Sequence, residues 1–110
     1  MKVAITLDES NMISGHFGHC PKYVIYDVQD GKIIGKDFVE NPGHESCTLP
    51  EFLSGYGVSV VITGGMGLKA NQAFSNLGIK TFTGITGSPD TAVEKYLKGE
   101  LTSSDSFCQH

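Results

Sequence analysis

The first forty residues alternate between short apolar runs and turn residues, which is typical of antiparallel strands. Residues 2–7 are almost all apolar, and residues 23–28 are rich in β-branched and aromatic side chains, so each stretch is expected to be a strand. Asp30-Gly31 then occupies the centre of a tight turn, a strong hairpin signal. We therefore expect a third strand at 32–40, antiparallel to the second.

Beyond residue 48 the apolar positions recur with the period of a helix, interrupted by two short strand-like runs. Leu49, Phe52, Leu53 and Tyr56 predict a short helix that Gly57 would end. The pattern then predicts a strand at Val58–Ile62, a helix with Met66, Ala70, Ala73, Phe74 and Leu77 on one face, a strand at Ile79–Thr83, and a helix that starts at Ser88-Pro89-Asp90 and buries Ala92, Val93, Tyr96 and Leu97.

The resulting order β-β-β-α-β-α-β-α predicts an α/β fold with one mixed five-stranded sheet and about three helices. Short antiparallel connections followed by right-handed crossovers give the strand order 3-2-1-4-5, with strand two antiparallel to strand one. We expect a single domain at 1–99 and a polar C-terminal tail at 100–110, which ends in a C-x-H sequence.

Charge and composition limit the classes of partner and the location that we expect. The formal net charge of the 110 residues is −4, which argues against a nucleic-acid partner. No apolar run approaches the roughly 20 residues that a membrane helix needs, and the N-terminus does not resemble a signal peptide. We therefore expect a cytoplasmic protein with reduced cysteines. The oligomeric state stays open.

All histidines and cysteines fall into three short segments, although random core cysteines and surface histidines would be scattered. Imidazole and thiolate are the side chains that bind zinc, copper and iron–sulfur clusters. Taken singly, each segment can be structural, with a histidine in a turn or a cysteine in the core; taken together, they predict a metal or metallocluster site. The candidate ligands are His16, His19, Cys20, His44, Cys47, Cys108 and His110.

The predicted topology gathers two of these segments. The loops that hold residues 16–20 and 44–47 both lie at the edge where strands one and four end, beside Gly64-Gly65-Met66-Gly67. These four residues open a helix, so they could bind an anionic cluster through backbone amides, or could simply allow close packing. Residues 108–110 could reach this edge, but nothing in the sequence requires it.

A rival interpretation starts from Asp8 and Glu9 at the end of strand one. A carboxylate there can help to bind Mg²⁺ in a nuclease. That site needs a second carboxylate at the end of the neighbouring strand, but strand four ends in Thr63-Gly64-Gly65. Asp8 more simply accepts hydrogen bonds from its own loop. No activated nucleophile is visible, so we expect a binding protein rather than an enzyme.

The chain also resembles the dinitrogenase iron–molybdenum cofactor biosynthesis family. The resemblance rests on Ser14-Gly-His-Phe-Gly-His-Cys20, Asn41-Pro-Gly-His-Glu45, Val61-Ile-Thr-Gly-Gly-Met-Gly67 and Tyr96-Leu-Lys-Gly99. It implies a ribonuclease-H-like fold and a carrier of iron–molybdenum cofactor or a related cluster, with His16 of the H-F-G motif as the best ligand candidate. His19-Cys20 and the C-x-H end depart from the nitrogenase carriers, so the resemblance does not identify the cargo.

The resulting hypothesis is a carrier of a metal–sulfur cluster, of the iron–molybdenum or molybdenum–copper type, or of a transition-metal ion. It implies cluster donor and acceptor proteins as partners. A small-anion or protein–protein binding module on the same fold is the main alternative, and a magnesium-dependent nuclease is the weaker one.

Overall fold

The computed structural model describes residues 1–15, 17, 20–41 and 49–102. Its element order is the one expected from the sequence. The elements are β1 (Lys2–Leu7), β2 (Lys22–Gln29), β3 (Lys32–Glu40), α1 (Leu49–Ser54), β4 (Val58–Ile62), α2 (Leu68–Asn76), β5 (Lys80–Phe82) and α3 (Pro89–Leu97).

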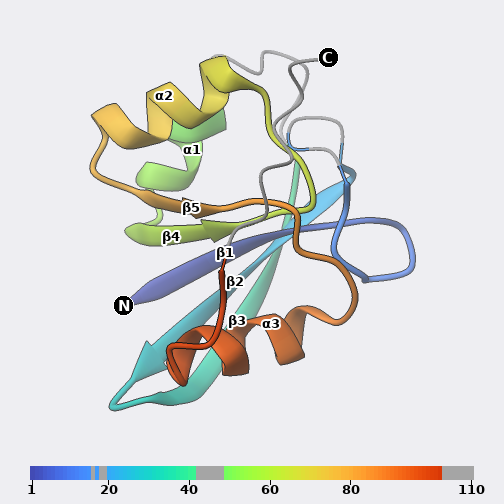
Figure 1. The fold of residues 1–110 in the computed structure, drawn as a ribbon, viewed down its shortest axis with the longest axis vertical. Helices are drawn as coiled ribbons and strands as arrows, with labels where there is room; N and C mark the ends of the chain where they lie inside the picture. Colours follow the sequence, from blue (N-terminus) through green and yellow to red (C-terminus); the bar gives the residue numbers. More distant parts are fainter. Residues whose placement is uncertain (16, 18–19, 42–48, 103–110) are drawn as a thin grey trace.

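The five strands form one mixed sheet in the order β3-β2-β1-β4-β5, which confirms the predicted topology. β1 and β2 are antiparallel, as are β2 and β3, whereas β1–β4 and β4–β5 are parallel. Helices α1 and α2 lie on one side of this sheet and α3 lies on the other (Figure 1). The parallel connections therefore place helices on both faces, as such crossovers require.

Alternate residues of each strand serve the two faces, so the molecule has two apolar layers. On the face covered by α3, here called the α3 face, Ile5, Tyr26 and Ile62 pack with Val93. On the opposite face, the α1–α2 face, the buried residues are Ala4, Phe17, Cys20, Tyr23, Ile25, Leu53, Val58, Val61, Met66, Phe74 and Ile79. β1, β2 and β4 are thus largely buried, whereas β3 is mostly exposed and the short β5 has one buried residue, Phe82.

Turn and cap residues explain where the elements end. Asp30 and Gly31 both have positive φ, 53° and 76°, as the predicted tight hairpin requires. Ser88 caps α3 by accepting a hydrogen bond from the Thr91 amide at 3.5 Å. Gly78, with φ of 76°, follows α2 in a Schellman arrangement, in which its amide bonds to Ser75 O. These local signals are readable without tertiary information.

Three details of the helix prediction were wrong. Met66 is buried but precedes α2, which begins only at Leu68. Tyr56 and Leu77 lie beyond the ends of α1 and α2 and are each 42% exposed rather than on a buried face. The helices end before the apolar period does, because Gly57 and Gly78 take left-handed conformations. The strand expected at 79–83 is shorter than predicted, at Lys80–Phe82.

Among the helices of the described residues, none is long and apolar enough to span a bilayer.

Candidate functional site

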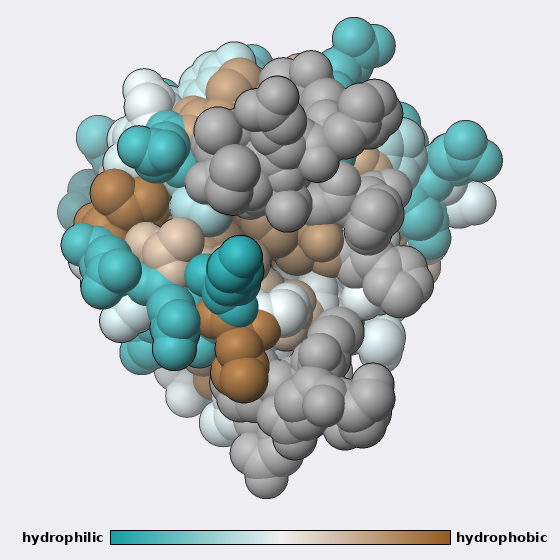
Figure 2. Space-filling model, turned by 90° about the horizontal axis from the view of Figure 1, so that it is seen from above, coloured by the Kyte–Doolittle hydropathy of each residue, from teal (hydrophilic) through white to brown (hydrophobic). Residues whose placement is uncertain are grey.

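The loops that carry the predicted site leave the sheet at one edge. β1 ends at Leu7 and the parallel strand β4 ends at Ile62, and β3 also ends there because it runs antiparallel to β2. We call this edge the carboxyl edge. In open α/β sheets, ligands bind where strand order reverses across such an edge, as it does here between β1 and β4. Figure 2, which views the molecule from above Figure 1, looks onto the side that carries α1 and α2, where hydrophobic residues lie beside polar ones.

Two backbone hydrogen bonds hold the β1–β2 loop against the glycine loop that follows β4. The Gly64 amide donates to Ser14 O at 2.9 Å, and the Phe17 amide donates to Gly65 O at 2.9 Å. The bonds run in opposite directions between the two loops, so they also fix the register of one loop on the other. They involve residues on both sides of His16 in the sequence.

The close approach of these loops explains the glycine at position 64. A methyl group at Gly64 would come within 2.7 Å of Ser14 O and 2.8 Å of Gly15 Cα, which are backbone atoms that cannot easily move. A methyl group at Gly67 would meet nothing within 4 Å. The Gly64 amide is also used within the protein. Gly64 therefore fits the close-packing interpretation of the glycine segment.

Two buried threonines at the ends of β1 and β4 connect the β1–β2 loop and the glycine loop. Thr6 Oγ1 donates to Thr63 Oγ1 at 2.9 Å, and both side chains are fully buried. Thr63 Oγ1 also lies 3.2 Å from Gly65 O. The backbone of Thr6 also holds the β1–β2 loop, because Thr6 O accepts a hydrogen bond from the Ser14 amide at 2.9 Å. Satisfied buried hydroxyls of this kind make one arrangement of the two loops preferable to others.

Phe17 anchors the β1–β2 loop to helix α2. Its ring is 5.2 Å from the Phe74 ring in an edge-to-face arrangement and 6.0 Å from the Tyr23 ring. Phe74 is fully buried and Phe17 is 9% exposed. Edge-to-face pairs contribute about 0.5–1.5 kcal/mol beyond the burial of their area. The Phe17 side chain is thus part of the core of the α1–α2 face.

Cys20 is the one predicted metal ligand that the structure describes. Its side chain is 2% exposed and belongs to the same apolar cluster as Met66. Burial is the main cause that raises the pKa of the Tyr23 phenol, followed by the charge of the Cys20 side chain and, least, a side-chain hydrogen bond with it. By distance and angle, the buried Tyr23 hydroxyl has no full hydrogen-bond partner in the described part of the protein. A sulfur atom and a poorly satisfied hydroxyl donor therefore share one buried place.

Asn41 connects the start of the β3–α1 loop to Cys20. Its Nδ2 donates to Cys20 O at 2.8 Å, and its backbone amide donates to Pro21 O at 3.1 Å. The chain that leads toward the second His/Cys segment thus begins at the end of the first one. The sequence analysis did not assign Asn41 this role, although the residue stands in the Asn-Pro-Gly-His-Glu motif of the resemblance.

The other six predicted ligands lie outside the described residues, namely His16, His19, His44, Cys47, Cys108 and His110. Within residues 1–15, 17, 20–41 and 49–102, no three His, Cys, Asp or Glu side chains are grouped so as to hold a metal ion. Of the predicted cofactor-binding residues, Gly64 and Gly65 contact the β1–β2 loop, Met66 is in the core, and Gly67 is the N-cap residue of α2.

Asp8, the basis of the nuclease alternative, is engaged by its own loop. Its Oδ1 accepts from the Ser10 amide at 2.8 Å and from the Met12 amide at 3.1 Å. This is the Asx-type turn that the simpler interpretation predicts.

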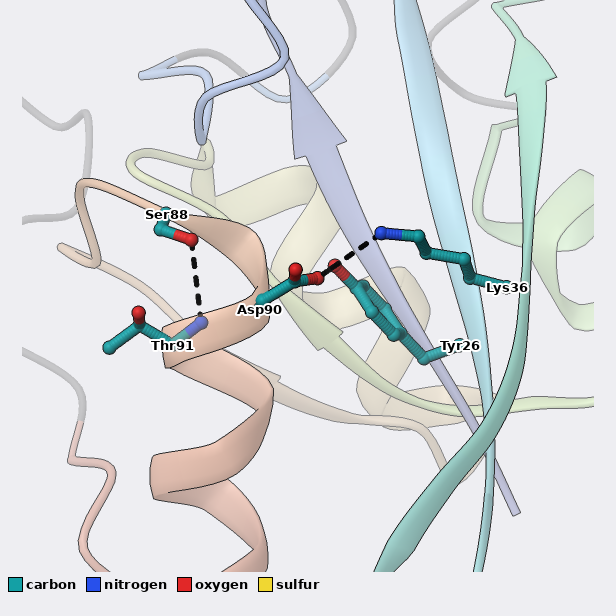
Figure 3. Close-up of polar contacts among 5 residues, drawn as sticks. All are labelled: Tyr26, Lys36, Ser88, Asp90 and Thr91. Carbon is teal, nitrogen blue, oxygen red and sulfur yellow. Dashed lines mark hydrogen bonds and ion pairs between the residues drawn. The ribbon is translucent and has the colours of Figure 1, made fainter.

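A second polar cluster occupies the α3 face, away from the glycine loop (Figure 3). The Tyr26 hydroxyl donates to Asp90 Oδ1, and Lys36 Nζ lies 3.5 Å from the same oxygen. The hydrogen bond from Tyr26 is the main cause that lowers the pKa of Asp90; burial opposes it, and Lys36 adds a smaller lowering. Burial, then this hydrogen bond, raises the pKa of Tyr26. The cluster joins α3 to β2 and β3, and it has no sulfur ligand.

Comparison with known proteins agrees with this architecture. The uncharacterized protein MJ0580 of Methanocaldococcus jannaschii is 32% identical over 106 residues, which are 92% of this chain and 89% of that protein. The crystal structure of PH0822 matches with a TM-score of 0.87 at 30% identity, over 96% of each chain. The apo form of the orange protein from Desulfovibrio gigas has the same fold, with a TM-score of 0.80 at 23% identity over 94% of this chain and 92% of that one.

The family model for the dinitrogenase iron-molybdenum cofactor matches residues 1–99, which include the whole sheet, its three helices and the fastened loops of the carboxyl edge. That match agrees with the resemblance carried by the H-F-G and G-G-M-G segments. The chain therefore belongs to the dinitrogenase iron-molybdenum cofactor family.

Proposed function

We propose that this protein is a carrier that binds a metal–sulfur cluster, or a soft transition-metal ion, at the carboxyl edge of its sheet. The observation that carries the proposal is the pair of hydrogen bonds that fastens the β1–β2 loop to the glycine loop, Gly64 N to Ser14 O and Phe17 N to Gly65 O. Ser14 and Phe17 flank His16 in the sequence, and tying these two residues to the glycine loop reduces the entropy that they lose when cargo binds.

The proposed ligands are soft or borderline donors. Cys20 would supply a thiolate, which is the ligand type that selects Cu(I), zinc and iron–sulfur clusters. The Tyr23 hydroxyl, which has no partner in the described structure, would donate to the Cys20 sulfur once it is a thiolate. Hydrogen bonds to ligand sulfur tune a bound metal. The other proposed ligands are His16, His19, His44 and Cys47, with Cys108 and His110 closing the site.

The glycine segment would have two tasks. Gly64 would hold the β1–β2 loop by its close approach, while Gly65, Met66 and Gly67 would present backbone amides to sulfide or oxo groups of the cargo. Among the described residues, the contact given for the Gly65 amide is a long one, 3.4 Å to Thr63 Oγ1. Gly67 has no side chain to cap the first turn of α2, and the positive end of a helix dipole favours an anion.

The proposal describes transport rather than catalysis. A carrier needs partners that load and unload it, so we propose a cluster donor protein and an acceptor protein. The family of this chain supports a role connected with iron–molybdenum-type cofactors. The experiment that follows identifies the metals in the cargo.

The test is anaerobic reconstitution of the purified protein with each of three probes, namely Cu(I), iron with sulfide, and tetrathiomolybdate with Cu(I). Elemental analysis and the absorption spectrum give the bound metal per chain. We expect one probe to give a stoichiometric, coloured complex with the natural sequence, and the double variant His16→Ala with Cys20→Ser to bind none. Tyr26→Phe, on the opposite face, is the control and should bind normally.

Two outcomes would contradict the proposal. A natural protein that stays colourless and metal-free with all three probes would favour a binding module for small anions or proteins. Equal metal content in the natural protein and the double variant would place the cargo elsewhere in the chain.

A further inference from the structure

Asn41 binds two successive carbonyl groups where the β1–β2 loop enters the sheet. Its side-chain Nδ2 donates to Cys20 O at 2.8 Å, and its backbone amide donates to Pro21 O at 3.1 Å. Asn41 directly follows β3, and at this end of the ladder Lys22 of β2 pairs with Glu40 of β3. The backbone of Cys20 is therefore held by the end of a regular antiparallel ladder.

The residue that follows Cys20 restricts the same backbone further. Proline disfavours the helical region for the residue before it, so Pro21 favours an extended conformation at Cys20. Pro21 itself has a fixed φ angle. Because Asn41 also binds the Cys20 carbonyl group, the Cys20 backbone has little freedom to rotate. The direction of its Cα–Cβ bond is thus set by neighbouring residues.

The surroundings of the Cys20 side chain make that direction important. The side chain is 2% exposed and lies in the apolar cluster of the α1–α2 face, which also contains Met66 and Tyr23. Protein interiors are close-packed, so a thiol in such a cluster cannot easily rotate to compensate for a displaced backbone. Bonds between a metal and sulfur have a defined length and geometry. A small displacement of the Cys20 backbone should therefore weaken metal binding.

We propose that Asn41 is a positioning residue for the cargo site, in which its side-chain amide holds the backbone of Cys20 so that the sulfur atom is directed at the bound metal. This inference rests on the proposed function, in which Cys20 supplies a thiolate ligand. Asn41 acts through the Cys20 carbonyl group and does not itself contact the metal. The role requires a hydrogen-bond donor of this length, because a carbonyl oxygen can only accept.

The expected size of the effect follows from other metal sites. Removal of a group that orients a metal ligand typically weakens metal binding about 10- to 100-fold. Asn41 binds the backbone of the proposed ligand rather than its sulfur atom, so we expect the lower end of this range, about tenfold.

Asn71 offers a matched control elsewhere in the molecule. Its Oδ1 accepts a hydrogen bond from Thr81 Oγ1 at 2.6 Å, which joins α2 to β5. Like the bond from Asn41 to Cys20 O, this bond is partly buried and connects segments that are apart in the sequence. The same substitution to leucine, which is similar in size and has no amide, can therefore be made at both positions.

The test compares Asn41→Leu and Asn71→Leu in the full chain, reconstituted anaerobically with Cu(I), iron with sulfide, or tetrathiomolybdate with Cu(I). Competition with a chelator of the same metal gives the affinity for each probe that the natural protein binds. We expect Asn41→Leu to weaken binding about tenfold and Asn71→Leu to leave it unchanged. Thermal melting of the metal-free proteins compares the stability of the two variants. If Asn41→Leu does not fold, Asn41→Asp, which retains the shape but lacks the donor, takes its place.

The absorption spectrum at saturating metal separates positioning from a general loss of stability. A displaced sulfur atom changes the thiolate-to-metal absorption band, whereas a less stable protein with an intact site keeps it. The band should therefore shift or weaken in Asn41→Leu and stay unchanged in Asn71→Leu. In the metal-free protein, the carbonyl ¹³C signal of Cys20 should move only in Asn41→Leu, because only that variant removes its hydrogen bond.

The outcomes distinguish this proposal from the proposed function. A natural protein that takes up none of the three probes would overturn both. Bound metal with the same affinity and the same absorption band in the natural protein and the Asn41 variant would overturn the positioning role alone. Equal weakening in the Asn41 and Asn71 variants, with the absorption band unchanged in both, would also overturn it, because lost stability would then explain the result.

Discussion

The two faces of the sheet each bury a tyrosine of β2, but they treat its hydroxyl differently. On the α3 face the Tyr26 hydroxyl donates to Asp90, and Lys36 completes the cluster. On the α1–α2 face the Tyr23 hydroxyl is buried without a hydrogen-bond partner among the described residues, next to the Cys20 thiol. Three positions along one strand thus separate a satisfied phenol from an unsatisfied one.

The difference indicates which face is shaped by stability and which by function. Buried polar groups are nearly always paired, so an unpaired one is a cost that a protein normally removes. On the α3 face this cost is absent, because the Tyr26 hydroxyl donates to Asp90. The α1–α2 face keeps it beneath the loops of the carboxyl edge, together with the described cysteine and Met66. Local departures from the most stable arrangement are expected at functional sites.

The largest expected effect comes from the aromatic anchors of the two faces. Phe17→Ala and Phe82→Ala each remove a ring that packs edge-to-face, against Phe74 at 5.2 Å and against Tyr96 at 5.6 Å. Each should lower the free energy of unfolding by about 3–5 kcal/mol. Only Phe17→Ala should also lower the metal content after reconstitution, because only Phe17 holds the β1–β2 loop. Equal metal loss in both variants would mean that general instability, not loop position, controls binding.

Gly64→Ala should have the next largest effect. Its methyl group would meet Ser14 O and Gly15 Cα at 2.7 and 2.8 Å, so the loops must separate. We expect the free energy of unfolding to fall by about 1–3 kcal/mol, as for other overpacked sites. Gly67→Ala, where the methyl group meets nothing within 4 Å, is the matched control. Urea denaturation of both variants measures the difference, and equal stabilities would refute the close fit of the two loops.

The two phenols should respond to the same substitution with opposite signs. Tyr23→Phe removes an unsatisfied buried hydroxyl and should raise the free energy of unfolding of the metal-free protein by about 1 kcal/mol. Tyr26→Phe removes the donor to Asp90 and should lower it by about 1 kcal/mol. Thermal melting of the two variants measures both values. A loss of stability in Tyr23→Phe would show that this hydroxyl has a partner after all.

The smallest expected effect is the pH dependence of the α3 face. The pKa of Asp90 is lowered in the folded protein, chiefly by the Tyr26 hydroxyl. Its contribution is therefore present above the unfolded pKa of about 3.9 and is lost as the pH falls through the lower folded value. Asp90→Asn should lower the free energy of unfolding near neutral pH by less than about 1 kcal/mol, since the side chain is 55% exposed.

Melting curves at several pH values measure this effect, and the stability difference between Asp90→Asn and the natural protein should shrink below about pH 4. Glu94→Gln, on the same helix, is the control for removing one negative charge. A stability difference that stays constant down to about pH 2 would mean that the carboxylate charge of Asp90 contributes nothing to the free energy of unfolding.

The fold was largely predictable because its signals are local. The strand order follows from apolar runs and from turn residues such as Asp30-Gly31 and Ser88-Pro89, whose conformations are as expected. The errors at Tyr56 and Leu77 have a simple cause, since an apolar period can continue past the residue where a helix ends. The family match over residues 1–99 agrees with the motifs that the sequence displays.

The polar framework of the site was not predictable from the sequence. Thr6 and Thr63 are 57 positions apart, and Asn41 and Cys20 O are 21 apart, so no local pattern relates them. Threonine and asparagine also occur commonly on surfaces, and their burial becomes evident only when the strands are assembled. The same holds for Tyr26 and Asp90, which are 64 positions apart. The sequence located the edge of the sheet but not the contacts that shape it.

The most direct test of the account is to locate bound cargo by NMR. The natural protein is labelled with ¹⁵N and reconstituted anaerobically with the probe that gives a stoichiometric complex. We expect the amide signals of Cys20, Asn41 and Gly64–Gly67 to shift or broaden, while those of Lys36 and Asp90 on the α3 face stay unchanged. Changes centred on the α3 face, with the glycine loop unaffected, would contradict a cargo site at the carboxyl edge.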